Sequence, residues 1–417
     1  MIINRDHYVN ALIQRKHNGS IKVVTGLRRC GKSFLLFTLF KNHLKQSGIA
    51  EDHIIEIVLD DLENEDLCEP HALLSYIKSC ITDTDMYYIL LDEVQEVPRF
   101  EALLNSLLHL QNADIYVTGS NSKFLSRDII TGFRGRGDEV HLYPLTFREF
   151  MSVYQGTEQK GWDEYITYGG LPPVILRETH EQKAKYLTDL FTETYLKDII
   201  ARNHIKNTAQ LETLIDVLSS SMGSLTNPQR ICNTFASVEK TTVSAVTIKS
   251  YLDALEYAFL IIPSRRFDVR GRKYIGSPLK YYFEDTGLRN ARLHFRQQED
   301  TYLMENVIFN ELRVRGYHVD VGVVELRETQ DNGVRARKQL EIDFVANQGS
   351  KKYYVQSAFS MPTAEKTAQE KKSLLNAGDN FKKIIVVKDA IMPRRDNDGI
   401  TTMSIFDFLL NENSLEL

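Results

Sequence analysis

A phosphate-binding loop is indicated by the run Gly26-Leu27-Arg28-Arg29-Cys30-Gly31-Lys32-Ser33-Phe34, which matches the pattern GxxxxGK[ST] at each required position. The two glycines allow the backbone to curl so that consecutive N–H groups point at phosphate oxygens. We expect Lys32 to reach the β- and γ-phosphates, and the Ser33 hydroxyl to ligate Mg2+. A strand before the loop and a helix after it would place the anion at a helix N-terminus. The spacing therefore predicts that residues 26–34 bind ATP with Mg2+.

Two consecutive carboxylates, Asp92 and Glu93, follow the apolar run 89–91. Asp92 is expected to hold the magnesium through its hydration shell, and Glu93 to orient or deprotonate the attacking water. The alternative, a strand that ends in a charged turn, is weakened by the phosphate-binding loop in the same chain. Small-molecule kinases have less use for a carboxylate such as Glu93, and a GTPase would need an NKxD loop, which the sequence lacks. Hydrolysis of ATP is the favoured chemistry.

Further groups that could contact the γ-phosphate come from two other segments. After the fourth predicted strand, Ser120 is preferred to Asn121 as the polar group between the two carboxylates and the γ-phosphate. Before the fifth predicted strand lie Arg127, Arg134 and Arg136. An arginine there could reach a neighbouring subunit's nucleotide and stabilise charge in the transition state. A solvated basic turn is an equally good interpretation of each of the three.

Short apolar runs alternate with amphipathic segments between residues 21 and 142. Strands that are apolar on both faces, each followed by a helix, predict an α/β fold with a parallel sheet covered on both sides. Both predicted motifs follow strands of this sheet directly. The expected strands are 21–24, 54–59, 87–91, 115–117 and 140–142.

The pattern changes after the P-loop domain, which we place at 1–146. A helical lid is expected over 147–207, broken by the run Gly169-Gly170-Leu171-Pro172-Pro173. Three helices and a β-hairpin predict a winged-helix domain over 208–295. Its second helix begins at Asn227-Pro228, and its third spans 244–257 with Val246, Leu252 and Leu255 directed inward.

The pattern of the last segment, 296–417, predicts an α/β domain that ends with a strand. Its expected helices are 302–315 and 363–376, and its expected strands are 317–324, 340–346, 352–359 and 383–388.

The composition is that of an ordinary globular chain. There are 51 Lys and Arg against 56 Asp and Glu, for a net charge of -5, which excludes a chain built wholly as a polycation for coating nucleic acid. The four cysteines form no CxxC pair and are expected to be reduced thiols. No apolar run approaches the ~18 residues of a membrane span, and the polar N-terminus lacks a signal peptide. We therefore expect a soluble cytoplasmic protein that does not bind membranes.

Several segments resemble those of prokaryotic AAA-type ATPases that carry a C-terminal domain of unknown function, and the likeness covers nearly the whole chain. The resemblance implies an ATPase domain, a winged helix and a degenerate restriction-endonuclease-like tail. It also aligns Gly135-Arg136 with the family's Gly-Arg step, which favours Arg136 as the arginine acting in trans within a homo-oligomer. The segments are GLRRCGKS, LLDEVQEVP, VTGSNS, GRGDEVHLYPLTFREF, YGGLPP, YLKDII, ENVIFNEL and EIDFVA.

An endonuclease-like fold needs a helix carboxylate, a strand Asp and a Glu-x-Lys to bind metal and activate water. Glu305 and Asp343 are the first two candidates. Gln356 and Ala358 stand where Glu and Lys are needed, and a neutral amide is a poor magnesium ligand. An active nuclease is therefore disfavoured. Two other lysines could in principle replace the missing one, namely Lys338 and Lys352.

The hairpin 264–273 holds five cations and one acid, so it could lie against DNA phosphates while the preceding helix faces a groove. Against this, the segment 211–290 is only mildly basic, and winged helices also pack subunits together. The sequence thus predicts a magnesium-dependent ATPase whose nucleotide state moves its C-terminal domains, with DNA as a candidate partner. The rival interpretation is a DNA-binding regulator that nucleotide merely switches, with little turnover.

Overall fold

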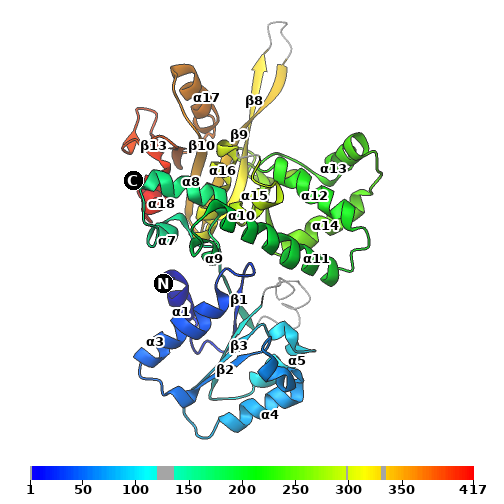
Figure 1. The fold of residues 1–417 in the computed structure, drawn as a ribbon. Coiled ribbons are helices and arrows are strands. Elements are labelled where there is room, and N and C mark those ends of the chain that lie inside the picture. The colour runs from blue at the N-terminus through cyan, green and yellow to red at the C-terminus, as the bar shows by residue number, and fades with distance from the viewer. Residues whose placement is uncertain (1, 120–135, 297–298, 330–334) are drawn as a thin grey trace. The chain divides into compact units, whose positions relative to one another are not determined.

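The computed structural model describes residues 2–119, 136–296, 299–329 and 335–417, and no side chains at 238–239, 327–329 and 335–336. The chain forms two compact units (Figure 1). The first unit contains residues up to Pro144 and the short segment Tyr257–Phe259; the second contains Leu145–Glu256 and Leu260–Leu417. How the second unit divides into the three domains expected from the sequence stays a prediction.

The first unit is built on a five-stranded sheet in the order β2-β3-β4-β1-β5, with every neighbouring pair parallel. This confirms the predicted parallel sheet. β1 is buried along its whole length and lies between β4 and β5, so both of its faces need cover. The strands are β1 Ile21–Thr25, β2 Ile54–Val58, β3 Tyr87–Asp92, β4 Ala113–Thr118 and β5 Gly137–His141.

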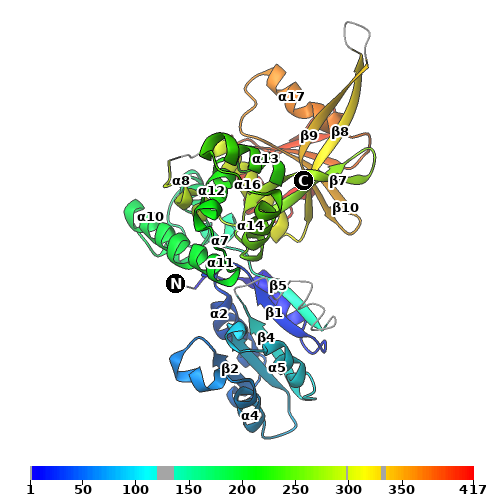
Figure 2. The same ribbon diagram turned by 90° about the vertical axis from the view of Figure 1, so that its right-hand side faces the viewer.

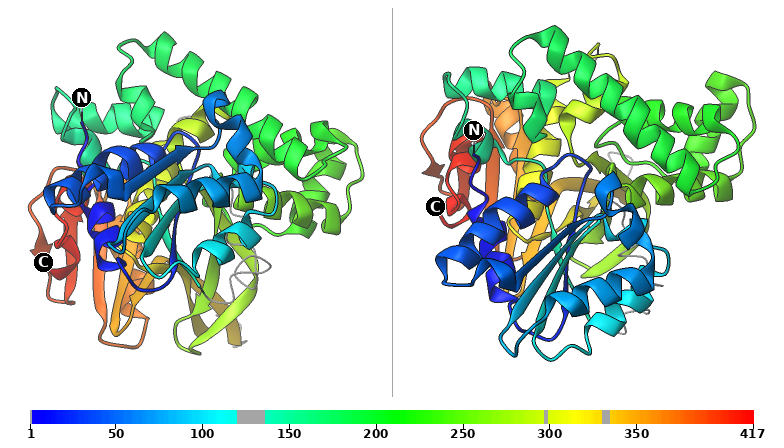
Figure 3. Two further views of the ribbon diagram at one scale, coloured as in Figure 1. Left: turned by 90° about the horizontal axis from the view of Figure 1, so that it is seen from below. Right: turned by 60° about the horizontal axis from the view of Figure 1, so that its bottom comes forward.

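Helices lie on both faces of this sheet (Figure 3). On one face, buried leucines of α4 and α5 pack against Ile55, Ile89 and Ile115. On the other, the ring of Phe40 lies 4.6 Å from that of Tyr116 on β4. A π-helical stretch, Leu35–Phe40, joins α2 to α3 without a break. The helices are α1 Asp6–Gln14, α2 Lys32–Phe34, α3 Lys41–Gln46, α4 Pro70–Cys80 and α5 Phe100–Leu107.

The first part of the second unit is helical. α10 and α11 form one long helix, because Leu190–Leu196 continues it between them (Figure 2). Asn227 caps α13 by accepting a hydrogen bond from the Arg230 backbone, as Asn227-Pro228 predicts. The helices of this part are α7 Phe147–Met151, α8 Glu158–Tyr168, α9 Pro172–Ile175, α10 His180–Asp189, α11 Lys197–Arg202, α12 Thr208–Ser220, α13 Pro228–Thr234, α14 Ala245–Tyr257 and α15 Thr286–Arg292.

The turn between α8 and α9 is held by a buried carboxylate. Asp285, at the start of α15, accepts hydrogen bonds from the backbone N–H groups of Gly170 (2.8 Å) and Leu288 (2.9 Å). Burial raises the pKa of Asp285 to about 6. A Cβ atom on Gly287 would lie 2.0 Å from the Tyr168 carbonyl oxygen, so α15 and the end of α8 are in backbone contact. The YGGLPP segment is thus a packing motif.

The rest of the second unit contains an eight-stranded sheet in the order β12-β13-β11-β10-β9-β8-β6-β7. α16, the antiparallel strands β8, β9 and β10, α17 and the parallel strand β11 follow one another along the chain. The strands are β6 Ile261–Asp268, β7 Lys273–Phe283, β8 His318–Thr329, β9 Arg335–Gln348, β10 Lys351–Ala358, β11 Lys382–Val387, β12 Arg394–Arg395 and β13 Ile400–Ser404; the helices are α16 Asp300–Val314, α17 Ala364–Leu375 and α18 Ile405–Leu410.

Two features of this sheet differ from the sequence expectation. The tail does not end with the strand at 383–388, because β12, β13 and α18 follow it and β13 pairs in parallel with β11. In addition, the hairpin of β6 and β7 extends the sheet of the tail, since β6 pairs in parallel with β8 from Arg266↔Val321 onward. The expected boundary at 295/296 therefore separates strands of one sheet.

Candidate nucleotide-binding site

The predicted phosphate-binding loop leaves the carboxyl end of the buried strand β1. Gly26 has φ 137°, and a Cβ atom there would lie 2.1 Å from the Leu142 carbonyl oxygen. Gly31 has φ 105° and is the N-cap residue that precedes α2, where the left-handed backbone favours glycine. Both glycines are thus required, Gly26 by close packing and Gly31 by its backbone angle.

Side chains of the loop divide into supporting and accessible groups. The side chains of Leu27 and Cys30, within the loop, are fully buried. Lys32 is also buried, and its Nζ donates hydrogen bonds to the carbonyl oxygens of Gly26 (3.1 Å) and Leu27 (3.0 Å). Ser33 and Phe34 are exposed on the first turn of the helix. The loop can therefore offer backbone N–H groups, an ammonium and a hydroxyl to a ligand.

Arg28 and Arg29 add two positive charges to the loop, besides that of Lys32. Arg29 is exposed and has a positive φ of 66°, whereas Arg28 is half-buried. Neither is needed to shape the turn in the way that the glycines are. Their charge favours an anionic ligand near the helix N-terminus.

Asp92 and Glu93 lie where the sequence predicts them, at the end of β3. Asp92 is 4% exposed, and the Ser33 hydroxyl is near enough to affect its carboxylate, so the phosphate-binding loop and the acidic strand end are neighbours. Burial raises the pKa of Asp92, while the hydroxyls of Ser33 and Thr118 oppose that rise. Oxygen donors from a hydroxyl and a carboxylate are what Mg2+ prefers, so the residues present fit this ion.

Thr118, at the end of β4, connects the two carboxylate residues. Its hydroxyl donates to Oδ1 of Asp92 and accepts from the backbone N–H of Glu93 at 2.9 Å. Thr118, the last residue of β4, was not among the polar residues expected here from the sequence, although it directly follows Val117. Ser120 and Asn121 lie outside the described residues.

Glu93 is held in a turn with a positive φ of 50°. Its carboxylate accepts a hydrogen bond from the side-chain amide of Gln95. On the other side of the loop, the Thr25 hydroxyl is hydrogen-bonded to Glu139 (2.5 Å) and His141 (3.0 Å) of β5. Polar groups therefore flank the loop on both neighbouring strands, and Glu139 and His141 were not predicted from the sequence.

Arg136 lies at the other end of the sheet from the loop. It is exposed, and its carbonyl oxygen accepts the backbone N–H of Ile21, the first residue of β1, at 2.8 Å. The loop follows Thr25, at the last residue of that strand. Arg136 is therefore separated from the loop of its own chain by the length of β1. Arg127 and Arg134 lie outside the described residues.

In the second unit, the two expected carboxylates of the tail come together. Glu305 and Asp343 are both 8% exposed. The lysine that acts on both carboxylates is Lys280, and not Lys338 or Lys352, which the sequence suggested. Burial and Glu305 raise the pKa of Asp343 well above its usual range, whereas Lys280 acts in the opposite direction. Lys352 instead lies over aromatic rings, 4.8 Å from that of Phe381.

The cations of the hairpin between β6 and β7 are only partly accessible. Arg266 is buried and donates to Gln339 at 2.8 Å, and Arg270 donates to the Asn376 carbonyl oxygen at 2.9 Å. The exposed cations are Arg265, Arg270, Arg272 and Lys273. On the preceding helix, Lys249 is paired with Asp253.

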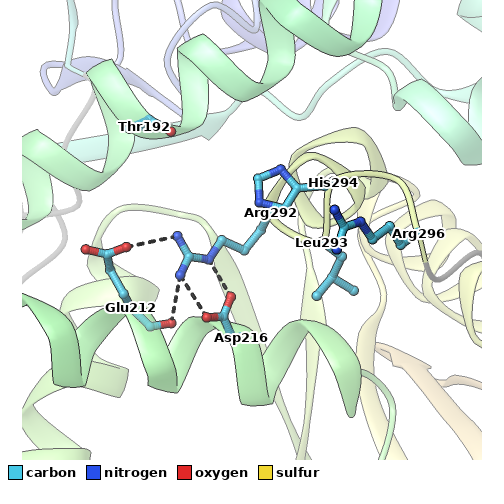
Figure 4. Close-up of a pocket in the computed structure, with 7 residues that line it drawn as sticks. All are labelled: Thr192, Glu212, Asp216, Arg292, Leu293, His294 and Arg296. Carbon is cyan, nitrogen blue, oxygen red and sulfur yellow. Dashed lines mark hydrogen bonds and ion pairs between the residues drawn. The ribbon is translucent and has the colours of Figure 1, made fainter.

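A cavity of about 540 Å3 lies between α12 and the end of α15 (Figure 4). Arg292 donates to both carboxylate oxygens of Asp216, at 2.6 and 2.9 Å, and to Glu212 at 3.3 Å. His294 and Arg296 at its rim are exposed. The charged groups in its wall thus serve mainly to tie the two helices together.

Residues 18–151 match an AAA domain, which supports a P-loop ATPase with nucleotide and, typically, Mg2+ as its ligands; residues 159–299 match a domain of unknown function, DUF8612. An uncharacterized protein of Haemophilus influenzae is 34% identical over 415 residues, covering 98% of this chain and 99% of the relative. An uncharacterized protein of Methanocaldococcus jannaschii is 27% identical, covering 89% and 80%.

Two solved structures are distant neighbours of this chain. The Aeropyrum pernix ORC1 protein in complex with DNA is 11% identical, with a TM-score of 0.32, covering 70% of this chain and 92% of that one. A DNA polymerase III gamma subunit-related protein of Thermotoga maritima is 10% identical, with a TM-score of 0.28, covering 61% and 100%. Among the described residues, no helix is long and apolar enough to cross a membrane.

Proposed function

The chain belongs to the same family as the uncharacterized Haemophilus influenzae protein, and from its AAA domain we propose that it binds ATP with Mg2+ and hydrolyses it. The observation that carries the proposal is the hydrogen-bonded series Asp92, Thr118 and Glu93 at the strand ends next to the loop. It places a pair of carboxylates suited to metal and water beside a loop suited to phosphate.

Each residue of the site has a proposed role. The loop N–H groups and Lys32 bind the β- and γ-phosphates, and Ser33 and Asp92 hold the magnesium. Glu93 orients or deprotonates the attacking water, and Gln95 fixes its carboxylate. When bound, Mg2+ supplies charge neutralisation at the phosphates. Thr118 takes the connecting role that the sequence analysis gave to Ser120, and Ser120 remains a second candidate for a γ-phosphate contact.

Replacing Glu93 tests the proposal. Glu93→Gln removes the base while keeping the shape of the side chain, so ATP turnover should fall at least roughly 100-fold while nucleotide binding persists. Glu96→Gln is the matched control, because Glu96 is exposed one turn away. Turnover is measured by phosphate release, and binding by a fluorescent ATP analogue. Equal turnover in the two variants would remove Glu93 from its role.

We further propose that the nucleotide state moves the C-terminal domains within a homo-oligomer. There Arg136, which lies away from its own chain's loop, would act on a neighbour's nucleotide. The proposed domains are a helical lid over 147–207, a winged helix over 208–295 and a degenerate endonuclease-like domain over 296–417. The succession α16-β8-β9-β10-α17-β11 supports the last of these. Solution mass with and without nucleotide tests assembly.

A DNA-binding regulator with little turnover is the second candidate. Exposed Arg265, Arg272 and Lys273 on one hairpin favour it. Phosphate contacts of this kind weaken steeply with added salt. ATP turnover with and without DNA separates the two candidates, because a nucleotide-switched regulator would bind DNA while its turnover stayed negligible.

A further inference from the structure

Four charged side chains and one tyrosine form a compact cluster where α16 packs against the eight-stranded sheet. α16 contributes Glu305, β9 contributes Glu341 and Asp343, and β7 contributes Lys280 and Tyr282. The Nζ atom of Lys280 lies 2.9 Å from Oε1 of Glu305 and 2.7 Å from Oε1 of Glu341. Only 5% of the lysine side chain is exposed, against 36% for Glu341. The cluster therefore meets solvent mainly through Glu341.

A divalent cation, which an endonuclease-like fold implies, does not fit these donors. Such an ion needs carboxylate oxygens free to approach it to about 2.0–2.6 Å. Here an ammonium already lies within 3 Å of two carboxylates. Oε1 of Glu305 also accepts the Tyr282 hydroxyl at 2.6 Å, and Oδ2 of Asp343 accepts the Ser357 backbone N–H at 2.8 Å.

Gln356, at the position of the third expected ligand, already makes hydrogen bonds that hold the fold together. The amide oxygen of Gln356 accepts the backbone N–H of Asp343, and its nitrogen donates to Glu370 of α17, each at 3.3 Å. Gln356 thus links β9, β10 and α17. It would have to give up both contacts to approach a metal.

We propose that Lys280 is a built-in counter-ion that takes the place of a divalent cation, so that this domain keeps its carboxylates together without metal and does not cut phosphodiesters. A buried carboxylate is costly unless it is paired, and the ammonium pairs with buried Glu305 and with half-buried Glu341 at once. Lys280 belongs to β7 and so lies outside the segment 296–417, in which Lys338 and Lys352 were the candidates for a catalytic lysine. The inference does not depend on ATP hydrolysis, because no residue of the nucleotide site takes part.

The first test replaces the lysine in the full-length, nucleotide-free protein. Lys280→Met is expected to lower the unfolding midpoint by roughly 6–20 °C, because buried negative charge loses its partner. Millimolar Mn2+ should recover much of this loss by entering the vacated cluster. Lys273→Met, at an exposed lysine on the same strand, should behave as wild type with and without Mn2+. A Lys280→Met protein as stable as the control would overturn the proposal.

A second comparison leaves Lys280 unchanged. Wild type and Glu305→Gln/Asp343→Asn should show the same Mn2+ response in thermal unfolding, and both should leave plasmid DNA intact with Mn2+. Stabilisation by Mn2+ that is present in wild type and lost in the double variant would overturn the proposal, as would plasmid nicking lost in Asp343→Asn. ATP turnover, measured in the same samples, should not change, which keeps this test separate from that of the proposed ATPase.

Discussion

Thr118 offers the sharpest test of how the nucleotide site is held together. Thr118→Val keeps the shape of the side chain but removes the hydroxyl that donates to Asp92 and accepts from the Glu93 N–H. Both contacts are buried or half-buried. The substitution therefore leaves a carboxylate without a donor and a backbone N–H without an acceptor.

The expected magnitude follows from the charge on Asp92. A hydrogen bond to an ionised group contributes about 1.5–3 kcal/mol. If that stabilisation persists in the transition state, its loss lowers kcat/KM by about 10- to 150-fold. Because the Thr118 hydroxyl holds the pKa of Asp92 down, its removal also raises that pKa further. The acid limb of the rate–pH profile should then move to higher pH.

The assay is steady-state ATP hydrolysis as a function of pH, together with thermal unfolding to confirm folding. Thr118→Ser is the matched control, because it keeps the hydroxyl and loses only a methyl group. A Thr118→Val enzyme with the activity and the acid limb of the serine variant would refute the connecting role of this side chain.

Two further predictions concern the stability of the second unit. Gly287→Ala places a methyl group 2.0 Å from the Tyr168 carbonyl oxygen and should lower the free energy of unfolding by about 1–3 kcal/mol in urea, whereas Gly276→Ala, with no atom within 4 Å, should cost little. The pKa of Asp285 is raised from 3.8 to about 6, so ionisation of this buried group destabilises the folded state as pH rises between those values. The stability deficit of Asp285→Asn relative to wild type should therefore narrow by up to ~3 kcal/mol from pH 4 to pH 7, and a constant deficit would contradict this reading.

The sequence predicts most of the features that are formed by consecutive residues. The five strands of the first sheet and the positions of Asp92 and Glu93 follow from local patterns, since each apolar run determines its own strand. Thr118 was overlooked because its importance depends on the neighbouring strand, 25 and 26 residues away. Lys280 was overlooked for the same reason, since its partner Glu305 is 25 residues away and lies on a helix.

Elements with ambiguous patterns were predicted less well. β13 consists of Ile400-Thr401-Thr402-Met403-Ser404 and is buried throughout. It was not predicted, because three of its five residues are polar and the apolar run that indicates a buried strand is missing. In α14, Val246 was expected to point inward but is 80% exposed, because the buried stripe runs through Ile248, Leu252 and Leu255. An apolar residue near a helix end is only weakly assigned by periodicity.

The first unit is not one continuous stretch of chain. Tyr257–Phe259 belongs to it, although the residues on either side belong to the second unit, and the Phe259 ring lies 4.7 Å from that of His141. A piece of the protein ending at Pro144 would thus lack part of its own packing. Recombination at that point would carry residues up to Pro144 into another gene and leave Tyr257–Phe259 behind.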